Sequence, residues 1–222
     1  MASASSCSRP HGEPGVPAIP DQQYYLPGSV RRSAKILVVG SFGVGKTTLI
    51  GSVSEIRPLR TEETMTIRSK GVDSLAGLPE KKTTTVAMDF GRITLTESTV
   101  LYMFGMPGQR RFWDLWDGLA EGAVGALVVV DTRRLADSFE VLDQMETRGD
   151  QLPFAVAVNV FPDSRQREPE EVREALDLLP GTPILRCDAR DRASSVRALA
   201  ALTRHSLAVD NEYALAAEKG SV

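Results

Sequence analysis

The stretch "GSFGVGKT", residues 40–47, decides the fold class of this chain. It fits the phosphate-binding pattern G-x-x-x-x-G-K-[ST], follows the apolar run "AKILVVG" at 34–40 and opens a helical pattern. Glycines in such a loop let successive backbone N–H groups and the helix N-terminus face phosphate oxygens. The alternative is a glycine-rich turn that happens to contain Lys-Thr, and the strand before it and the helix after it argue against that.

Within this loop we expect Lys46 to bridge the outer phosphates of a nucleotide and the Thr47 hydroxyl to bind Mg²⁺. The residues predicted to contact the phosphates are Ser41, Phe42, Gly43, Val44, Gly45, Lys46, Thr47 and Thr48.

Around the loop, apolar runs rich in β-branched residues alternate with helical patterns, which predicts a doubly wound α/β domain with helices on both faces of the sheet. The apolar runs lie at 34–40, 84–95, 99–105, 124–131, 154–160 and 183–189, and the helical patterns at 46–55, 110–121, 134–148, 169–179 and 191–207. Residues 84–105 hold two strands joined by the short "TES", which indicates a hairpin. We therefore expect a P-loop NTPase fold with about six mostly parallel strands and one antiparallel edge strand.

Composition excludes several classes of function. The chain has 222 residues and a net charge of −3, with no basic stripe of the kind that binds nucleic acid. The longest apolar runs are far short of the ~20 residues that a membrane-spanning helix needs. Two widely separated cysteines make no disulfide framework, which favours the cytoplasm, or a position at the inner face of the membrane held through a partner.

Three regions are expected along the chain. Residues 1–30 are rich in Ser, Pro and Gly and predict a disordered arm. Residues 31–208 form the P-loop domain, and residues 209–222 a flexible tail.

A second stretch, "VLYMFGMPGQRRFW" at 100–113, is an apolar strand that breaks into Gly-x-Pro-Gly-Gln. In a nucleotide switch this turn monitors the terminal phosphate: Gly108 offers its N–H to the third phosphate, and Gln109 orients the attacking water as the catalytic residue. Such switches usually carry Asp at the end of the strand, where this chain has Gly105. Ahead of the preceding strand, Thr85 supplies a loop hydroxyl for the metal, although the run of threonines is also typical of residues entering a strand.

The order of the phosphate-binding loop, "TTTVAMDF" (83–90), "GMPGQ" (105–109), "AVNVFPD" (157–163) and "CDARD" (187–191) resembles a Ras-superfamily small GTPase over residues 34–205. Among bacterial small GTPases, the turn without Asp is similar to that of the gliding-motility polarity GTPases. The whole chain resembles the GTPase component of the actinobacterial conservon operons.

This resemblance implies a GTP/GDP switch whose Mg²⁺ rests on Thr47, Thr85, phosphates and water. It also implies three partners: a Roadblock-type regulator, a small conservon protein and a sensor-kinase-like membrane protein.

The base-binding residues depart from the family pattern. The family reads guanine with Asn-Lys-x-Asp, and here Asn159 is followed by Val160, with Asp163 one residue late. If Asp163 turns toward the base, guanine is favoured, and if it points to solvent, discrimination is weak. The last element is Asp188-Ala189-Arg190, where the Ala189 N–H is expected to meet the O6 of guanine. We expect guanine, with adenine as the alternative.

Phe42 replaces the glycine usual in relatives that hydrolyse well, so hydrolysis should be slow. Its ring either crowds the space for Gln109 or folds outward as a lid. Asp89 and Asp131 are interpreted as structural acids.

Three functions remain open: a switch with slow hydrolysis controlled by a partner, a nucleotide-loaded module that never cycles and carries ATP or GTP, and a small-molecule kinase, for which no lid segment is evident.

Overall fold

The computed structural model describes residue 26 and residues 28–57, 59–66, 83–108, 114–148 and 152–219. For parts of these ranges, chiefly 59–66, 83–87 and 212–219, only the backbone is described. Almost all of the predicted arm at 1–30 therefore lies outside the described residues, and so does Gln109.

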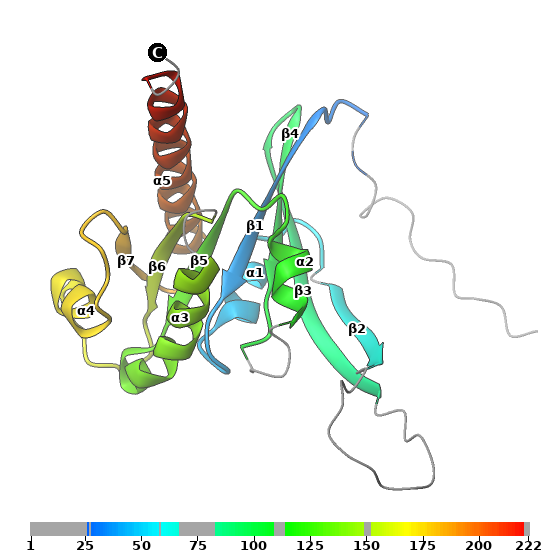
Figure 1. The fold of residues 1–222 in the computed structure, drawn as a ribbon. Coiled ribbons are helices and arrows are strands. Elements are labelled where there is room, and N and C mark those ends of the chain that lie inside the picture. Colours follow the sequence, from blue (N-terminus) through cyan, green and yellow to red (C-terminus); the bar gives the residue numbers. More distant parts are fainter. Residues whose placement is uncertain are drawn as a thin grey trace, which may run out of the picture.

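Within the described residues, the core is a seven-stranded sheet with the order β2-β3-β4-β1-β5-β6-β7 (Figure 1). Its strands are β1 (Arg32–Val39), β2 (Leu59–Thr66), β3 (Thr83–Thr96), β4 (Thr99–Gly105), β5 (Gly125–Val130), β6 (Phe154–Asn159) and β7 (Ile184–Cys187). β4, β1, β5, β6 and β7 are parallel, and β3 runs antiparallel to both of its neighbours. The predicted fold class is confirmed, with β2 as an additional strand outside the antiparallel one.

Helices cover both faces of the sheet (Figure 1). They are α1 (Lys46–Val53), α2 (Asp114–Ala120), α3 (Phe139–Arg148), α4 (Pro169–Ala175) and α5 (Arg192–Lys219), with a 3₁₀ segment η2 (Thr132–Ser138) before α3. One apolar cluster joins α1 and α5 to the sheet, and a second joins α2, α3 and α4 to the opposite face. Because the central strands are covered on both sides, all six residues of β5 are buried, which explains their continuously apolar sequence.

The hairpin of β3 and β4 contains an irregularity that sets which residues face each other. Thr96 pairs with Thr99, but the next pair is Thr94 with Val100, so Leu95 is an extra residue on β3. A regular hairpin would place Phe90 opposite Gly105, whereas the bulge places Asp89 there. β3 begins at Thr83, so the threonines predicted for a loop before the strand are part of it.

The C-terminal helix is longer than the sequence patterns indicated. α5 spans 28 residues and continues to Lys219, so the boundary predicted at residue 208 falls inside a helix. The segment after 208 contains Ala, Leu, Glu and Lys, which favour helix, and no Gly or Pro before Gly220. In Figure 1 the end of α5 extends away from the other elements.

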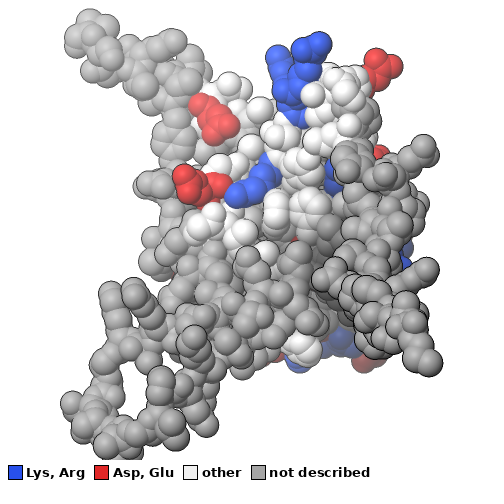
Figure 2. All heavy atoms as spheres, turned by 90° about the vertical axis from the view of Figure 1, so that its right-hand side faces the viewer, with Lys and Arg blue, Asp and Glu red and all other residues white. Residues whose placement is uncertain are grey.

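On the face seen from the right-hand side of Figure 1, the described residues include charged ones of both signs among uncharged ones (Figure 2). In the part of the chain that the structure describes, no helix is both long enough and apolar enough to cross a membrane.

The docking of α5 on the sheet can be tested with two leucines of this helix. Leu202 is fully buried, whereas Leu207 is 59% exposed. We expect Leu202→Ala to lower the free energy of unfolding by about 2–5 kcal/mol through lost burial and a residual cavity. Leu207→Ala, the matched control, should change it by no more than about 0.5 kcal/mol. Urea denaturation measures both, and equal effects would contradict the described docking.

Candidate nucleotide-binding site

The phosphate-binding loop connects β1 to α1 at the carboxyl edge of the sheet. Gly45 immediately precedes α1 with a left-handed backbone, at φ 106°. A Cβ on Gly45 would lie 2.4 Å from Nδ2 of Asn159, so only glycine fits between the loop and that side chain. The predicted loop is thus present, and its sharp turn is tied to the end of β6.

Lys46 folds back over this loop. Its Nζ donates to the carbonyl oxygens of Gly40 and Ser41, each at 2.8 Å. Burial lowers the pKa of Lys46 to about 8, while the negative charge of Asp89 acts in the opposite direction. The ammonium therefore lies against the backbone that is expected to surround the phosphates.

Next to Thr47, the predicted metal ligand, lies an acidic residue that the sequence interpretation did not place at the site. The Thr47 hydroxyl donates a hydrogen bond of 2.5 Å to Oδ2 of Asp89, a residue of β3. Asp89 pairs across the hairpin with Gly105, and a Cβ on Gly105 would lie 3.0 Å from the Cβ of Asp89. A carboxylate of the neighbouring strand thus lies beside Gly105, where the switch pattern has an Asp of its own. The sequence contained both Gly105 at the end of one strand and Asp89 on the preceding strand. That these two residues face each other could be seen only from the register of the hairpin.

The turn after β4 packs directly on the phosphate-binding loop. A Cβ on Gly108 would lie 2.3 Å from the carbonyl oxygen of Gly40 and 3.0 Å from the Cα of Ser41. The buried Trp116 of α2 donates its indole N–H to the carbonyl oxygen of Pro107, at 3.4 Å. The turn thus joins the loop to α2. The predicted role of Gln109 falls outside the described residues.

Asn159, at the end of β6, links the phosphate-binding loop to the loop after β7. Its Nδ2 donates to the carbonyl oxygen of Val44 at 2.8 Å, and its Oδ1 accepts from the N–H of Ala189 at 3.0 Å. Asn159 and Ala189 are both buried. The Ala189 N–H is predicted to meet the O6 of guanine, and in the structure it donates to Asn159. This hydrogen bond satisfies a buried N–H, which would be costly to leave without an acceptor.

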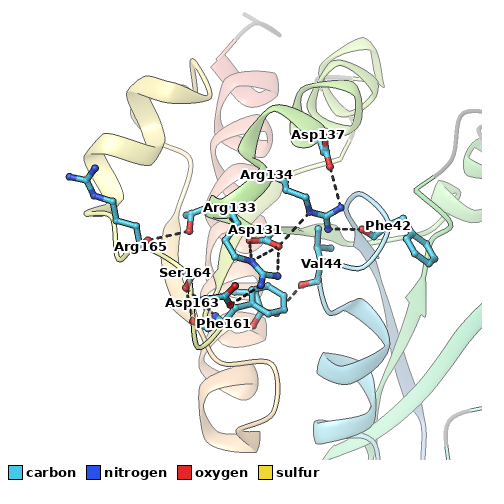
Figure 3. A network of polar contacts seen from close by, with 12 residues as sticks. Phe42, Val44, Asp131, Arg133, Arg134, Asp137, Phe161, Asp163, Ser164 and Arg165 are labelled. Carbon is cyan, nitrogen blue, oxygen red and sulfur yellow. Dashed lines mark hydrogen bonds and ion pairs between the residues drawn. The ribbon is translucent and has the colours of Figure 1, made fainter.

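The other predicted base reader, Asp163, also has a different partner. Its Oδ1 accepts from Nη1 of Arg133 at 2.9 Å, while its side chain is 73% exposed (Figure 3). Arg133 in turn donates through Nε and Nη2 to Asp131, the buried acid at the end of β5. Burial acts to raise the pKa of Asp131, but hydrogen bonds from Arg133 outweigh it and lower that pKa.

Arg134 carries the same network to the phosphate-binding loop (Figure 3). Its Nη2 donates to the carbonyl oxygen of Phe42 at 3.0 Å, and its Nε lies 3.8 Å from Oδ2 of Asp131. The side chain of Phe42 is 75% exposed, in keeping with the outward-folded alternative for this ring.

The remaining predicted residues lie on α1, in the loop after β7 and on β3. Thr48 is exposed on α1, and Asp188 and Arg190 pair with each other, with Nη2 of Arg190 at 2.8 Å from Oδ2 of Asp188. The backbone of Thr85 pairs with Thr64 inside the sheet, and its side chain lies outside the description.

The loop, Asp89, Asn159 and Ala189 therefore converge at the carboxyl edge of the central parallel strands, where open α/β sheets bind their ligands. This arrangement defines a nucleotide-binding P-loop protein. The same architecture is found in the G domain of the iron transporter FeoB from T. maritima, which superposes with a TM-score of 0.51. The two chains share 16% identity, and the match covers 80% of this chain and 99% of that domain.

The family model described as "Conserved hypothetical ATP binding protein" matches residues 38–209, and the chain belongs to that family. A curated relative, "Uncharacterized protein MJ1339" of Methanocaldococcus jannaschii, is 28% identical over 127 residues. That match covers 56% of this chain and 68% of the relative.

The lowered pKa of Lys46 predicts how nucleotide affinity depends on pH. At least about one pH unit below this pKa, the ammonium is charged in both the free and the bound protein, so its titration leaves the affinity unchanged. Above pH 8 the free protein loses the proton that bound phosphates require, so the Kd for GDP should rise by up to about tenfold per pH unit. Calorimetric titration between about pH 7.5 and 9.5 measures this. Lys46→Ala should bind weakly at every pH, and a variant that keeps the same pH dependence would rule out Lys46 as its source.

Proposed function

We propose that the protein is a guanine-nucleotide switch with slow GTP hydrolysis controlled by a partner. The observation that carries the proposal is the packing of Gly108 on the backbone of Gly40 and Ser41. A third phosphate bound by the loop would meet this turn and displace it. The hydrogen bond from Trp116 to Pro107 would then pass the displacement to α2.

Mg²⁺ fits the oxygen groups at this position. Thr47 and Asp89 offer a hydroxyl and a carboxylate in direct contact, and hard oxygen ligands together with phosphates are what Mg²⁺ prefers. Among the described residues no group of three or more His, Cys, Asp and Glu gathers to hold a metal, so phosphates and water would complete the coordination. When bound, the ion neutralises charge on the phosphates. Thr85 is proposed as a second hydroxyl ligand, which would require this end of β3 to leave its pairing with Thr64 when the nucleotide binds.

We infer slow hydrolysis from the residue at the third position of the phosphate-binding loop. Phe42 stands at its third position with the ring exposed and the carbonyl held by Arg134. We propose that Gln109 needs a partner to place the attacking water beside this loop. A nucleotide-loaded module that never cycles is the second candidate, and the presence of Phe42 favours it.

The identity of the base has two candidates. The architecture shared with a G domain supports guanine. The pairing of Asp163 with Arg133 weakens the carboxylate readout of guanine and leaves adenine as the alternative, which agrees with the description of the family as ATP binding.

The resemblance to the GTPases of conservon operons supports a set of partners. We propose that a Roadblock-type regulator acts on this protein, alongside a small conservon protein. A sensor-kinase-like membrane protein would place the switch at the inner face of the membrane.

A switch of this kind should be visible in tryptophan emission. Replacing GDP by a non-hydrolysable GTP analogue with Mg²⁺ should change the intensity or wavelength of Trp116 emission, because its indole bonds to the turn that would move. Trp113→Phe removes the second tryptophan and isolates the signal. Identical spectra in the two loaded states, with occupancy confirmed by chromatography of the released nucleotide, would favour the non-cycling module. Release of ATP or ADP from the purified protein would favour adenine.

The role of Asp89 can be tested through the Mg²⁺ requirement. Asp89→Asn keeps the shape of the side chain and removes its charge, so the Mg²⁺ concentration that half-maximally slows GDP release should rise roughly 10- to 100-fold. Asp210→Asn, at an exposed position on α5, is the control for loss of one acidic charge. A titration of release rate against Mg²⁺ that gives the same midpoint for all three proteins would exclude Asp89 from the metal site.

A further inference from the structure

The end of β5 and the loop after β6 are joined by one arginine. Arg133 donates to Asp131 through Nε and Nη2, at 3.0 and 2.8 Å, and to Asp163 through Nη1 at 2.9 Å (Figure 3). Its guanidinium also lies over the ring of Phe161, with Cζ 3.8 Å from the centroid. Each of the three guanidinium nitrogens therefore donates a hydrogen bond, and Asp131, which is 1% exposed, fixes the position of the group.

The loop that carries Asp163 is itself held closed. The Ser164 hydroxyl donates to the carbonyl oxygen of Phe161 at 2.9 Å and accepts from the N–H of Phe161 at 3.1 Å. Next to this turn, the Thr132 hydroxyl donates to the carbonyl oxygen of Arg165 at 3.2 Å. The turn between Phe161 and Ser164 thus presents the Asp163 carboxylate to Arg133.

We propose that Arg133 is a positioning residue that sets base preference, because it holds the Asp163 carboxylate away from the edge of a bound purine. This inference rests on the proposed nucleotide-binding function. Guanine offers two donors, N1–H and the 2-amino group, to a carboxylate, and adenine has no matching pair. While Asp163 remains on Arg133, guanine must break an ion pair to gain that contact, and adenine loses nothing.

The size of the effect follows from the exposure of the pair. Asp163 is 73% exposed and Arg133 is 31% exposed, so their interaction falls among the weak surface ion pairs. Such a pair changes an equilibrium by roughly two- to fivefold. Freeing Asp163 should therefore raise the ratio of GDP affinity to ADP affinity by the same factor.

The experiment is a competition of GDP, ADP and inosine diphosphate against a fluorescent nucleotide, on the full chain. Arg133→Gln should raise the GDP-to-ADP affinity ratio roughly two- to fivefold. Asp163→Asn should abolish that effect, so the double variant keeps the ratio of Asp163→Asn alone. Inosine lacks the 2-amino group, so Arg133→Gln should improve inosine diphosphate less than GDP.

Arg134→Gln is the matched control, because Arg134 lies beside the same Asp131 but bonds to Phe42 of the phosphate-binding loop. It should weaken GDP and ADP alike and leave their ratio unchanged. If Arg133→Gln binds both nucleotides with the wild-type ratio, or if Arg134→Gln shifts the ratio equally, the role of Arg133 is refuted while the nucleotide site stands. If the wild-type protein binds neither nucleotide, the proposed function fails and this inference fails with it.

A measurement on the wild-type chain guards against a variant that does not fold. Raising KCl from about 0.05 M to about 0.5 M screens an exposed ion pair, so the GDP-to-ADP ratio should rise toward the value of Arg133→Gln. The two nucleotides carry the same phosphate charge, so general screening cancels in their ratio. A ratio that does not depend on salt would contradict the proposal.

Discussion

The site depends on the two hydrogen bonds of the Asn159 side chain. One amide group bridges the loop after β1, through Val44, and the loop after β7, through Ala189. Both contacts are buried, where an unpaired polar group costs about 1–3 kcal/mol, so neither loop can shift without losing a partner. Gly45 completes the constraint, because any side chain there would collide with the same amide. The curvature of the phosphate-binding loop is therefore set by a residue more than a hundred positions away in the chain.

The fold could be predicted from the sequence because its signals are local. The phosphate-binding pattern joins a strand to a helix, and continuously apolar runs mark strands covered on both faces, as found for β5. β2 was missed because "LRTEETMT" is polar and lacks the alternation of a half-buried strand. The end of α5 was placed too early because the helix continues without a stop signal to Gly220.

The site was predicted less completely, because two of its contacts depend on which strands are neighbours. Asp89 was interpreted as structural, since its position opposite Gly105 follows from hairpin pairing and from the bulge at Leu95. Asp163 was a candidate base reader with both orientations left open, and nothing in its own segment indicates its contact with Arg133, thirty residues earlier. The parallel pairing of β5 with β6 brings the ends of these strands together and lets the two side chains meet.

The bulge at Leu95 also affects how related sequences should be compared. Leu95 is the extra residue between Thr94 and Thr96. In a chain that lacks this residue the hairpin would be regular, and the residue corresponding to Asp89 would still pair with Gly105. The position of the acid beside Thr47 is therefore set by its pairing with Gly105 across the hairpin. It is not set by any residue within the Gly-Met-Pro-Gly-Gln turn. An alignment that inspects only the end of β4 would score such a chain as lacking an acid. Counting back along the preceding strand, with a one-residue allowance at the bulge, would recover it.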